Sequence, residues 1–287
     1  MKNYVIYTDS CADLTQEAYR ALGLRCIPLD VIVENEEPIA DDQIDIQEIY
    51  AKLRAKKSAS TAAINIDRFL QSFEEAAREG LDVLYLGFSS GLSSTYSSSV
   101  IAMRELQEKY PQNKFYAVDT LCASMGQGLL VYYAAKKKEA GASIEEVRDF
   151  VENTKMNLCH WFTVDDLMYL KRGGRVSGAT AVVGTMLNIK PVMHMDDAGH
   201  LVKVGTARGR KSSIHALADQ VGALALPEEK QTMFISHGDC LEDAQYLAKL
   251  VKERMGVKEV DIGYTGAVIG SHSGPGTLAL FFLGEHR

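Results

Sequence analysis

The first half of the chain alternates between two patterns of hydrophobic positions. Short runs rich in apolar and β-branched residues, at 4–10, 82–90 and 114–120, predict buried strands. Between these runs, apolar residues recur every three or four positions. This spacing predicts amphipathic helices at residues 15–24, 44–57, 95–111 and 124–141, and a further helix that ends at Gly80. Strands and helices in this alternation are typical of a mainly parallel sheet covered by helices.

Two segments of the first half have less regular patterns. Residues 27–35 alternate between apolar and polar positions and predict one more strand. Residues 58–65, SASTAAIN, are small and predict a loop that leads into the helix ending at Gly80. Ser60 or Thr61 is suited to capping that helix.

The second half has a different order of elements. Helical patterns cover residues 143–157, 209–226 and 241–256. Residues 190–210 predict a hairpin, and residues 257–284 predict two strands around a glycine-rich loop. We therefore expect two domains, at residues 1–157 and 158–287.

Length and composition agree with a two-domain globular protein. The chain has 287 residues, of which 46% are hydrophobic and 24% are charged, and single domains usually have about 100–200 residues. The formal net charge of −7 argues against non-specific binding to nucleic acid or to an anionic membrane. An anionic ligand would therefore be held by local donors.

Other features of the sequence indicate where in the cell the protein is found. No stretch approaches the roughly 18 apolar residues that span a bilayer, so we expect no integral membrane segment. The N-terminus, MKNYVIYTDS, lacks the apolar core of a signal peptide. The five cysteines are scattered and form no CxxC pair, which is typical of free thiols in the cytoplasm. We expect a cytoplasmic protein with no metal site and no cofactor.

The segment GFSSGLSSTYSSS, residues 87–99, has seven serines where a predicted strand meets a predicted helix. In open α/β sheets, ligands bind outside the carboxyl ends of the strands, where helix N-termini present free N–H groups. Ser93 and Ser94 would add hydroxyl donors, and Gly91 would let the backbone approach a ligand. An ordinary N-cap with additional serines explains the segment equally well.

Three other segments could contribute to a site. The loop at 58–65 resembles the serine segment and could converge with it on one ligand. Residues 118–128 form a third junction of strand and helix, where Asp119 and Ser124 fit turns and caps. Arg172 and Arg175 flank a Gly-Gly turn that could hold a phosphate, or could simply be solvated.

Residues 266–282, GAVIGSHSGPGTLALFF, surround His272 with glycines. A histidine there could donate to an anion or transfer a proton, although a lone histidine is more often structural. The sequence has no GxSxG elbow and no metal-ligand signature, and His194 with His200 is a chance pairing. The GxxxxGK[ST] phosphate loop is also missing.

Taken together, several ordered motifs resemble the DegV family of bacterial fatty-acid-binding proteins, whose better-understood members are the binding subunits of fatty acid kinase. The resemblance covers nearly the whole chain. It rests on YTDSCADL, SASTAAIN, SSGLSSTYSSS, DTLCASMGQGLLV, LKRGGRVSG, LNIKPV, GHLVKVGTARGRK and IGSHSGPGTLALFF. It implies an α/β first domain with a parallel sheet, a second domain with a six-stranded mixed sheet and helices, and a tunnel for an acyl chain between them.

The resemblance also implies roles for particular residues. The ligand carboxylate would meet Thr61 and Ser93, with His272 nearby, and a separate kinase would phosphorylate it with ATP. Gly91, Ser94 and Gly270 belong to the same implied ligand site. The arginines implied to handle phosphate or to contact the kinase are Arg172, Arg175 and Arg208. Where the family often has glycine, this chain has Ser94, and its SASTAAIN segment lacks the family's proline. Both departures leave the preferred chain length open.

The sequence therefore predicts a carrier of a long-chain fatty acid that acts with a separate kinase and is not itself an enzyme. Burial of each CH₂ contributes about 0.8 kcal/mol, so a sixteen-carbon tail would contribute on the order of 10 kcal/mol before association costs. Two alternatives remain. One is a serine hydrolase that uses Ser93 or Ser94 with His272, and the other is a binder of a different small anion, such as a phosphorylated metabolite.

Overall fold

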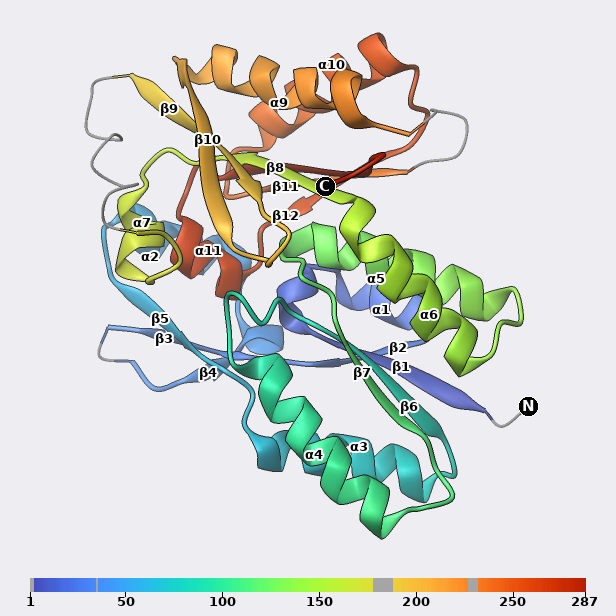
Figure 1. Cartoon of the computed structure of the whole chain (residues 1–287). Helices are drawn as coiled ribbons and strands as arrows, with labels where there is room; N and C mark the ends of the chain where they lie inside the picture. The colour runs from blue at the N-terminus through green and yellow to red at the C-terminus, as the bar shows by residue number, and fades with distance from the viewer. Residues whose placement is uncertain (1–2, 35, 178–187, 227–231) are drawn as a thin grey trace.

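The computed structural model describes residues 3–34, 36–177, 188–226 and 232–287. Three sheets organise these residues, and they lie in two halves that are joined by helices (Figure 1). The first sheet and its helices form the lower half of the view, and the six-stranded sheet forms the upper half. The predicted α/β architecture, with a parallel sheet first and a mixed sheet second, is confirmed.

The first sheet is fully parallel. Its strands, in spatial order, are β2 (Leu24–Ile27), β1 (Tyr4–Asp9), β6 (Asp82–Gly87) and β7 (Phe115–Asp119). One face is covered by α3 (Ile66–Arg78) and α4 (Thr95–Lys109). The other face is covered by α1 (Gln16–Ala21), α5 (Ser124–Glu139) and α6 (Ile144–Thr154). Helices on both faces bury the strands on both sides, which explains their continuous apolar runs.

Helix α3 shows how the sequence forms these layers. Its residues Phe69, Phe73, Ala76 and Ala77 are buried at the spacing of one helix face. The side chain of Asn65 caps the helix by accepting from the backbone N–H of Arg68 at 2.9 Å. The predicted cap at Ser60 or Thr61 was therefore wrong.

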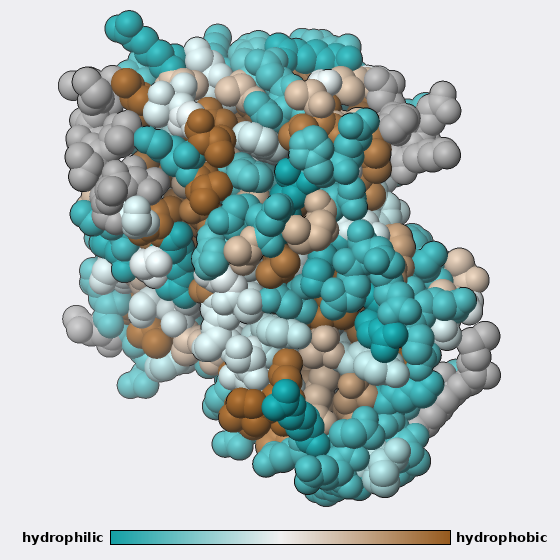
Figure 2. All heavy atoms as spheres, viewed as in Figure 1, coloured by the Kyte–Doolittle hydropathy of each residue, from teal (hydrophilic) through white to brown (hydrophobic). Residues whose placement is uncertain are grey.

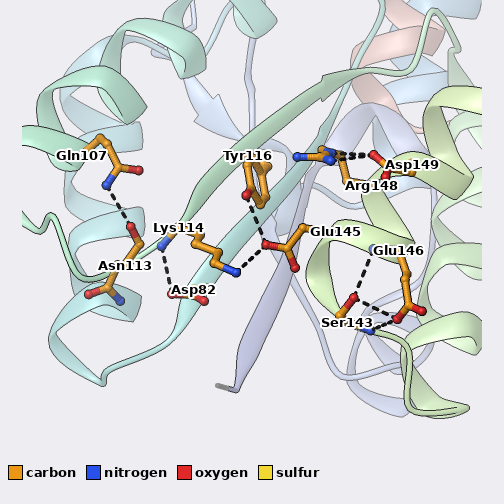
Figure 3. Close-up of polar contacts among 10 residues, drawn as sticks. All are labelled: Asp82, Gln107, Asn113, Lys114, Tyr116, Ser143, Glu145, Glu146, Arg148 and Asp149. Carbon is orange, nitrogen blue, oxygen red and sulfur yellow. Dashed lines mark hydrogen bonds and ion pairs between the residues drawn. The ribbon is translucent and has the colours of Figure 1, made fainter. Parts of the chain in front are cut away.

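Polar contacts hold the amino-terminal edge of the parallel sheet (Figure 3). The Lys114 ammonium lies 2.5 Å from Glu145 of α6, and Tyr116 of β7 donates to the same carboxylate at 3.2 Å. Ser143 and Glu146 form a reciprocal capping box at the start of α6. This edge is structural, because the carboxyl ends of the strands lie at the opposite edge.

A small antiparallel sheet of three short strands was not predicted from the sequence. Its strands are β4 (Ile39–Ala40), β3 (Asp30–Val33) and β5 (Ala59–Ala62). The single strand predicted at 27–35 is instead split, because β2 ends at Ile27 and β3 begins at Asp30, while residue 35 lies outside the described residues. The loop predicted at 58–65 contains β5, so Thr61 belongs to a strand.

The mixed sheet has six strands, all antiparallel to their neighbours except one parallel pair. In order they are β10 (Leu201–Arg208), β9 (Ile189–Met195), β8 (Leu158–Thr163), β13 (Leu278–Leu283), β11 (Met233–His237) and β12 (Val260–Tyr264). Helices α9 (Arg210–Leu224) and α10 (Leu241–Met255) cover its outer face. Its inner face packs on α5, which is therefore shared by both halves.

Short helices complete the architecture. They are α2 (Ile46–Arg54), α7 (Met168–Arg172), α11 (Ala267–Ser273) and the 3₁₀ helices Ser10–Ala12, Asp41–Gln43 and Lys155–Asn157. Helix α11 occupies the segment predicted as a glycine-rich loop, which is a correction. It follows β12 of the mixed sheet yet packs beside β5 of the small sheet, so the two halves interlock. A boundary between residues 157 and 158 stays a prediction.

The surface in this view is mostly hydrophilic, and the cysteines are unpaired. Hydrophilic side chains cover most of the face in Figure 2, and hydrophobic atoms gather there in separate patches. Each of the five cysteines is free. Across the part of the chain that the structure describes, no helix has the length and apolar character needed to cross a bilayer.

Candidate functional site

A cavity of about 300 Å³ lies between the carboxyl edge of the parallel sheet and the inner face of the mixed sheet. This volume is at the lower end of the roughly 300–1,000 Å³ that is usual for ligand sites. Most of the wall is apolar. It includes Leu29, Ala63, Phe88, Leu92, Phe162, Leu170, Met195, Leu201, Val268, Ile269, Ala279 and Phe281. A long hydrocarbon ligand suits such a wall.

Thr61 and His272 form the central polar contact of the cavity wall. The Thr61 hydroxyl on β5 lies 2.8 Å from Nε2 of His272 on α11. Helix α11 can approach this closely because Gly270 has no side chain, and a Cβ there would lie 2.6 Å from the Tyr50 hydroxyl. Gly270 itself does not line the cavity; it packs α11 against α2.

His272 is held as a neutral imidazole. Burial, together with a smaller effect of the nearby Arg175 guanidinium, lowers its pKa from 6.5 to about 4. A neutral ring has one donor and one acceptor nitrogen, so His272 can bond Thr61 with one nitrogen and keep the other polarity for a ligand or a backbone group. Gly173 lies against Nδ1, where a Cβ would come within 2.3 Å.

Ser93 lies just before α4, whose N-cap residue, Ser94, makes no side-chain cap bond. The Ser93 Oγ accepts from the backbone N–H of Thr95, the first residue of the helix, at 3.2 Å and lies 2.9 Å from the Thr95 hydroxyl. Its role as a donor to a ligand stays a prediction. Ser93 also lines the cavity, as does Ser94. Ser94 is exposed and caps nothing with its side chain, so its hydroxyl is available.

Buried contacts fix the loop that carries Ser93. The Asp9 carboxylate accepts from the backbone N–H of Phe88 at 2.9 Å and from the Tyr85 hydroxyl at 2.6 Å. The Ser89 hydroxyl donates to the carbonyl of Gly199 at 2.8 Å, which links the loop to the hairpin of β9 and β10. Asp119 also accepts from the backbone N–H of Ser90 at 3.2 Å, and it has the predicted turn role, because it accepts from the backbone N–H of Leu121 at 3.1 Å.

Gly91 makes a close approach, but to protein. A Cβ at Gly91 would lie 2.8 Å from the carbonyl oxygens of Ala198 and Gly199 in the hairpin turn. Gly91 is not part of the cavity wall. Its lack of a side chain lets the two halves of the molecule pack together beside Ser93.

The three arginines lie in different environments. Arg175 lines the cavity and donates to the carbonyls of Leu92, at 3.2 Å, and Gly173. Arg172 stacks on Tyr169 at 4.6 Å from the ring centroid. Arg208 is exposed at the far end of β10, about 23 Å along the strand from Leu201, so the structure does not bring it to the cavity.

A groove of about 360 Å³ adjoins the Thr61 and His272 contact. Thr61, Arg175 and His272 line both the groove and the cavity. The rest of the groove wall is Ile32, Glu34, Ser58, Ala59, Ser60, Tyr169, Arg172, Gly173 and Ser271. A group held at Thr61 and His272 would therefore be close to a surface that carries two arginines.

Further polar residues of the cavity were missed from the sequence. Ser236, Thr265 and Ser273 line it, as do Ser124 and His160. Each is a lone hydroxyl or imidazole near the end of a helix or a strand. Ser124 and Ser273 stand in segments that the sequence singled out, and Ser236, Thr265 and His160 do not. No local spacing connects them, so no sequence signal could have grouped them.

A serine hydrolase would need a hydrogen bond between Ser93 or Ser94 and His272, and the structure shows no such bond among the described residues. A serine nucleophile needs a base within hydrogen-bond reach. Here Ser93 bonds Thr95, and His272 bonds Thr61. Among the described residues, no group of three His, Cys, Asp or Glu side chains is arranged to hold a metal ion.

The chain was compared with known proteins. The family model of the DegV family matches residues 3–285. A DegV domain-containing protein of Clostridium perfringens is 47% identical to this chain. The alignment covers 100% of this chain and 99% of that protein. A DegV family protein of Thermus thermophilus, described by its fatty acid binding, is 32% identical, with a TM-score of 0.88 over 98% of this chain and 99% of that one.

A second solved structure agrees in fold and carries a ligand. A DegV family protein of Ruminococcus gnavus, refined with vaccenic acid, is 26% identical, with a TM-score of 0.88 over 97% of this chain and 99% of that one. The family model and the Clostridium relative each span nearly all of the chain. The resemblance drawn from the motifs is confirmed: the chain belongs to the DegV family.

Proposed function

We propose that this protein binds a long-chain fatty acid in the cavity, in the cytoplasm, and presents its carboxylate to a separate kinase. The observation that carries the proposal is an apolar cavity whose wall has a neutral Thr61 and His272 pair with Ser93 beside it. The Thermus and Ruminococcus relatives, whose structures concern fatty acid binding and vaccenic acid, support the ligand class.

The proposed site suits a carboxylate because its donors are aimed and mostly neutral. Thr61, Ser93 and Ser94 supply hydroxyls, and a neutral His272 that donates its Nε2–H to Thr61 would leave the Thr61 proton free for the ligand. Hydrogen bonds from neutral donors to a charged acceptor contribute about 1.5–3 kcal/mol each. The apolar wall would supply most of the affinity, and the hydroxyls would orient the head group.

Presentation to a kinase is supported by the groove outside the same residues. A carboxylate at Thr61 and His272 would lie between the apolar cavity and a surface with Arg172 and Arg175. A carboxylate oxygen would attack the γ-phosphorus of ATP, which forms an acyl phosphate and releases ADP. Arginine on that side suits the transferred phosphoryl group. Arg208, on a separate exposed surface, would serve as a docking contact for the kinase.

The test begins with the purified protein. Its organic extract is analysed by mass spectrometry, and the delipidated protein is then titrated with palmitic and oleic acids while its thermal unfolding is followed. We expect a long-chain fatty acid in stoichiometric amount and a rise of the unfolding temperature on its return. An empty extract with no thermal response would refute the ligand class and favour another small anion.

The kinase step needs a separate assay. The loaded protein is incubated with ATP and a candidate kinase, and hydroxylamine is used to trap any acyl phosphate as a hydroxamate. Hydroxamate that forms only when protein, kinase and ATP are all present supports presentation. Binding of fatty acid without any trapped hydroxamate would indicate that the protein delivers the fatty acid to an acceptor other than this kinase.

A further inference from the structure

One side chain of the cavity wall carries a permanent charge. Among the described residues that line the cavity, Arg175 is the only arginine, lysine, aspartate or glutamate. The two histidines of the wall, His160 and His272, are neutral, because burial lowers the pKa of each. A guanidinium stays protonated inside a protein. The otherwise apolar cavity therefore contains one fixed positive charge.

The described residues offer Arg175 no carboxylate partner. Its guanidinium donates to two backbone carbonyls, from Nε to Leu92 at 3.2 Å and from Nη1 to Gly173. A guanidinium has five N–H donors, so both hydrogens of Nη2 have no acceptor in this part of the chain. Arg175 is half-buried, and charges that are removed from water are normally paired. The position therefore suits an anion that the protein itself does not supply.

The two carbonyls place the guanidinium next to the proposed carboxylate site. Leu92 directly precedes Ser93, and Gly173 packs against the imidazole of His272, where a Cβ would lie 2.3 Å from Nδ1. Arg175 and His272 both line the cavity and the groove, so both belong to the wall between them. In agreement with this proximity, the Arg175 guanidinium adds to the effect of burial on the His272 pKa. A carboxylate held by Ser93 and His272 would lie beside this guanidinium.

A carboxylate in an apolar cavity needs such a partner to stay ionised. Removal from water disfavours the charged form, so a carboxyl group that meets only neutral donors tends to keep its proton. The proposed transfer requires the ionised form, because a protonated carboxyl group is a much weaker nucleophile. A guanidinium N–H forms a charge-assisted hydrogen bond, which is about twice as strong as one between neutral groups. Arg175 could therefore keep the bound acid reactive.

Arg175 also has a structural role that a test must separate from this one. Its two hydrogen bonds link the loop that carries Ser93 to the turn after α7. Loss of that link alone would loosen the cavity wall for any ligand, charged or uncharged. Loss of a counter-ion would weaken only ligands with an anionic head group. The charge of the ligand's head group therefore distinguishes the two roles.

We propose that Arg175 is the counter-ion of the bound carboxylate, so that the site selects ionised fatty acids over neutral lipids with the same chain. Its Nη2 would donate to a carboxylate oxygen, while Thr61 and Ser93 orient the head group. The bonds from Nε and Nη1 to the two carbonyls can remain, because they use other hydrogens. This inference rests on the proposed function, because it requires the head group of a fatty acid at Thr61 and His272.

The test compares oleic acid with oleyl alcohol, which has the same chain and an uncharged head group. Dissociation constants are measured at neutral pH on the delipidated full-length chain and on its Arg175→Gln variant, which loses the charge and keeps a polar side chain. We expect the unsubstituted protein to prefer the acid. The variant should bind the acid about ten- to a hundredfold more weakly, as expected for a hydrogen bond to a charged group. Its affinity for the alcohol should stay nearly unchanged.

Two further variants separate charge from structure. Arg175→Lys keeps the charge but loses the planar fork of donors, so it should retain much of the preference for the acid. Arg104→Gln is the matched control, because Arg104 is an exposed arginine of α4 that lines neither the cavity nor the groove. It removes the same charge from the chain and should bind both ligands as the unsubstituted protein does. Thermal unfolding of each delipidated variant checks that it is folded.

The protonation of the bound acid gives a second measurement. Oleic acid labelled with carbon-13 at its carboxyl carbon reports its charge through its NMR shift as the pH is varied. In Arg175→Gln, the bound acid should take up its proton at a higher pH than in the unsubstituted protein. The other charged or titratable groups at this wall, His272, Glu34 and Arg172, are the same in both proteins. The difference between the two curves therefore reports Arg175.

The outcomes separate this inference from the proposed function. If Arg175→Gln weakens acid and alcohol by the same factor, the arginine is only a structural link and the inference is overturned. If the variant keeps the full preference for the acid, the inference is overturned as well, and fatty-acid binding stands in both cases. If Arg175→Gln does not fold, Arg175→Lys decides, since equal weakening of both ligands would refute the counter-ion. If the unsubstituted protein binds neither ligand, the proposed function fails and this inference fails with it.

Discussion

The hydroxyl of Thr61 lies 2.8 Å from Nε2 of His272, although 211 positions separate the two residues in the chain. The contact joins a strand of the small sheet to a helix that follows the mixed sheet. Because neither residue can form it alone, the proposed carboxylate site would exist only when both halves of the molecule have folded together. This dependence makes the pair a sensitive target for substitution.

Replacing the hydroxyls of the carboxylate site should weaken fatty-acid binding without unfolding the protein. Thr61→Ala and Ser93→Ala each remove one donor to a charged group, so each should lower affinity about tenfold or more, and the double variant further. Titration with oleic acid measures this loss. Ser97→Ala is the control, because Ser97 is an exposed serine of the same helix as the capped turn. Equal affinities for the double variant and the control would refute the site.

Acid should destabilise the protein in part through His272. Its pKa is 6.5 in the unfolded reference and about 4 in the folded state. The unfolded chain therefore binds the proton first, and the contribution of His272 to stability is complete above about pH 6.5 and is lost as the pH falls toward about 4. Urea unfolding at several pH values should show a smaller acid loss for His272→Gln, by up to about 3 kcal/mol. Parallel curves for the two proteins would contradict this assignment.

A side chain at residue 91 should force the loop and the hairpin apart. The Cβ of Gly91→Ala would meet two backbone carbonyls at 2.8 Å, and backbone cannot rotate away as a side chain can. We expect a loss of about 1–3 kcal/mol in the free energy of unfolding. Gly222→Ala serves as the control, since Gly222 is exposed in α9 with nothing within 4 Å of the added atom. That variant should gain about 1 kcal/mol from helix propensity. A stable Gly91→Ala protein would show that the hairpin can shift.

The arginines should affect the kinase step in different ways. Arg172 lines the groove and not the cavity, so Arg172→Ala should retain its fatty acid yet form acyl phosphate more slowly at saturating carrier. Arg208 is exposed and lines neither the groove nor the cavity, so Arg208→Ala should raise the apparent KM for the carrier and leave kcat unchanged. Hydroxamate trapping over a range of carrier concentrations separates the two effects. If Arg172→Ala raised the KM and Arg208→Ala lowered kcat, the proposed roles of the two arginines would be exchanged.

Sequence periodicity predicted β1, β6 and β7 of the parallel sheet, because each is a mostly apolar run next to an amphipathic helix. It missed β2, whose sequence LRCI contains Arg25 and lies between the helix predicted to end at residue 24 and the strand predicted to begin at residue 27. It failed for β5 and α11. The strand at 59–62 has small, weakly patterned residues and is held by pairing with β3, which local pattern does not reveal. Helix α11 has glycine inside it, and the tight contact of Gly270 with Tyr50 explains a residue that otherwise argues against a helix.

The candidate site was predictable only in part for the same reason. Thr61, Ser93 and His272 stood in unusual segments, and the structure brings them to one cavity. Ser236 and Thr265 stand in ordinary surroundings in the sequence, and only the folded structure connects them, because Ser236 contacts Ser124 and Thr265 donates to Ser236. Which hydroxyls share a cavity is decided by strand order, and no single sequence shows that order.

The bond between the Ser89 hydroxyl and the Gly199 carbonyl has a consequence for the speed of exchange. It fastens the loop that carries Ser93 to the hairpin that closes over the other side of the cavity. Where a bound chain leaves between these two segments, the Ser89 contact must break first. The residence time of the fatty acid would then depend on this contact, and its affinity would depend on the cavity wall. The rate of release would therefore not depend on the length of the acyl chain.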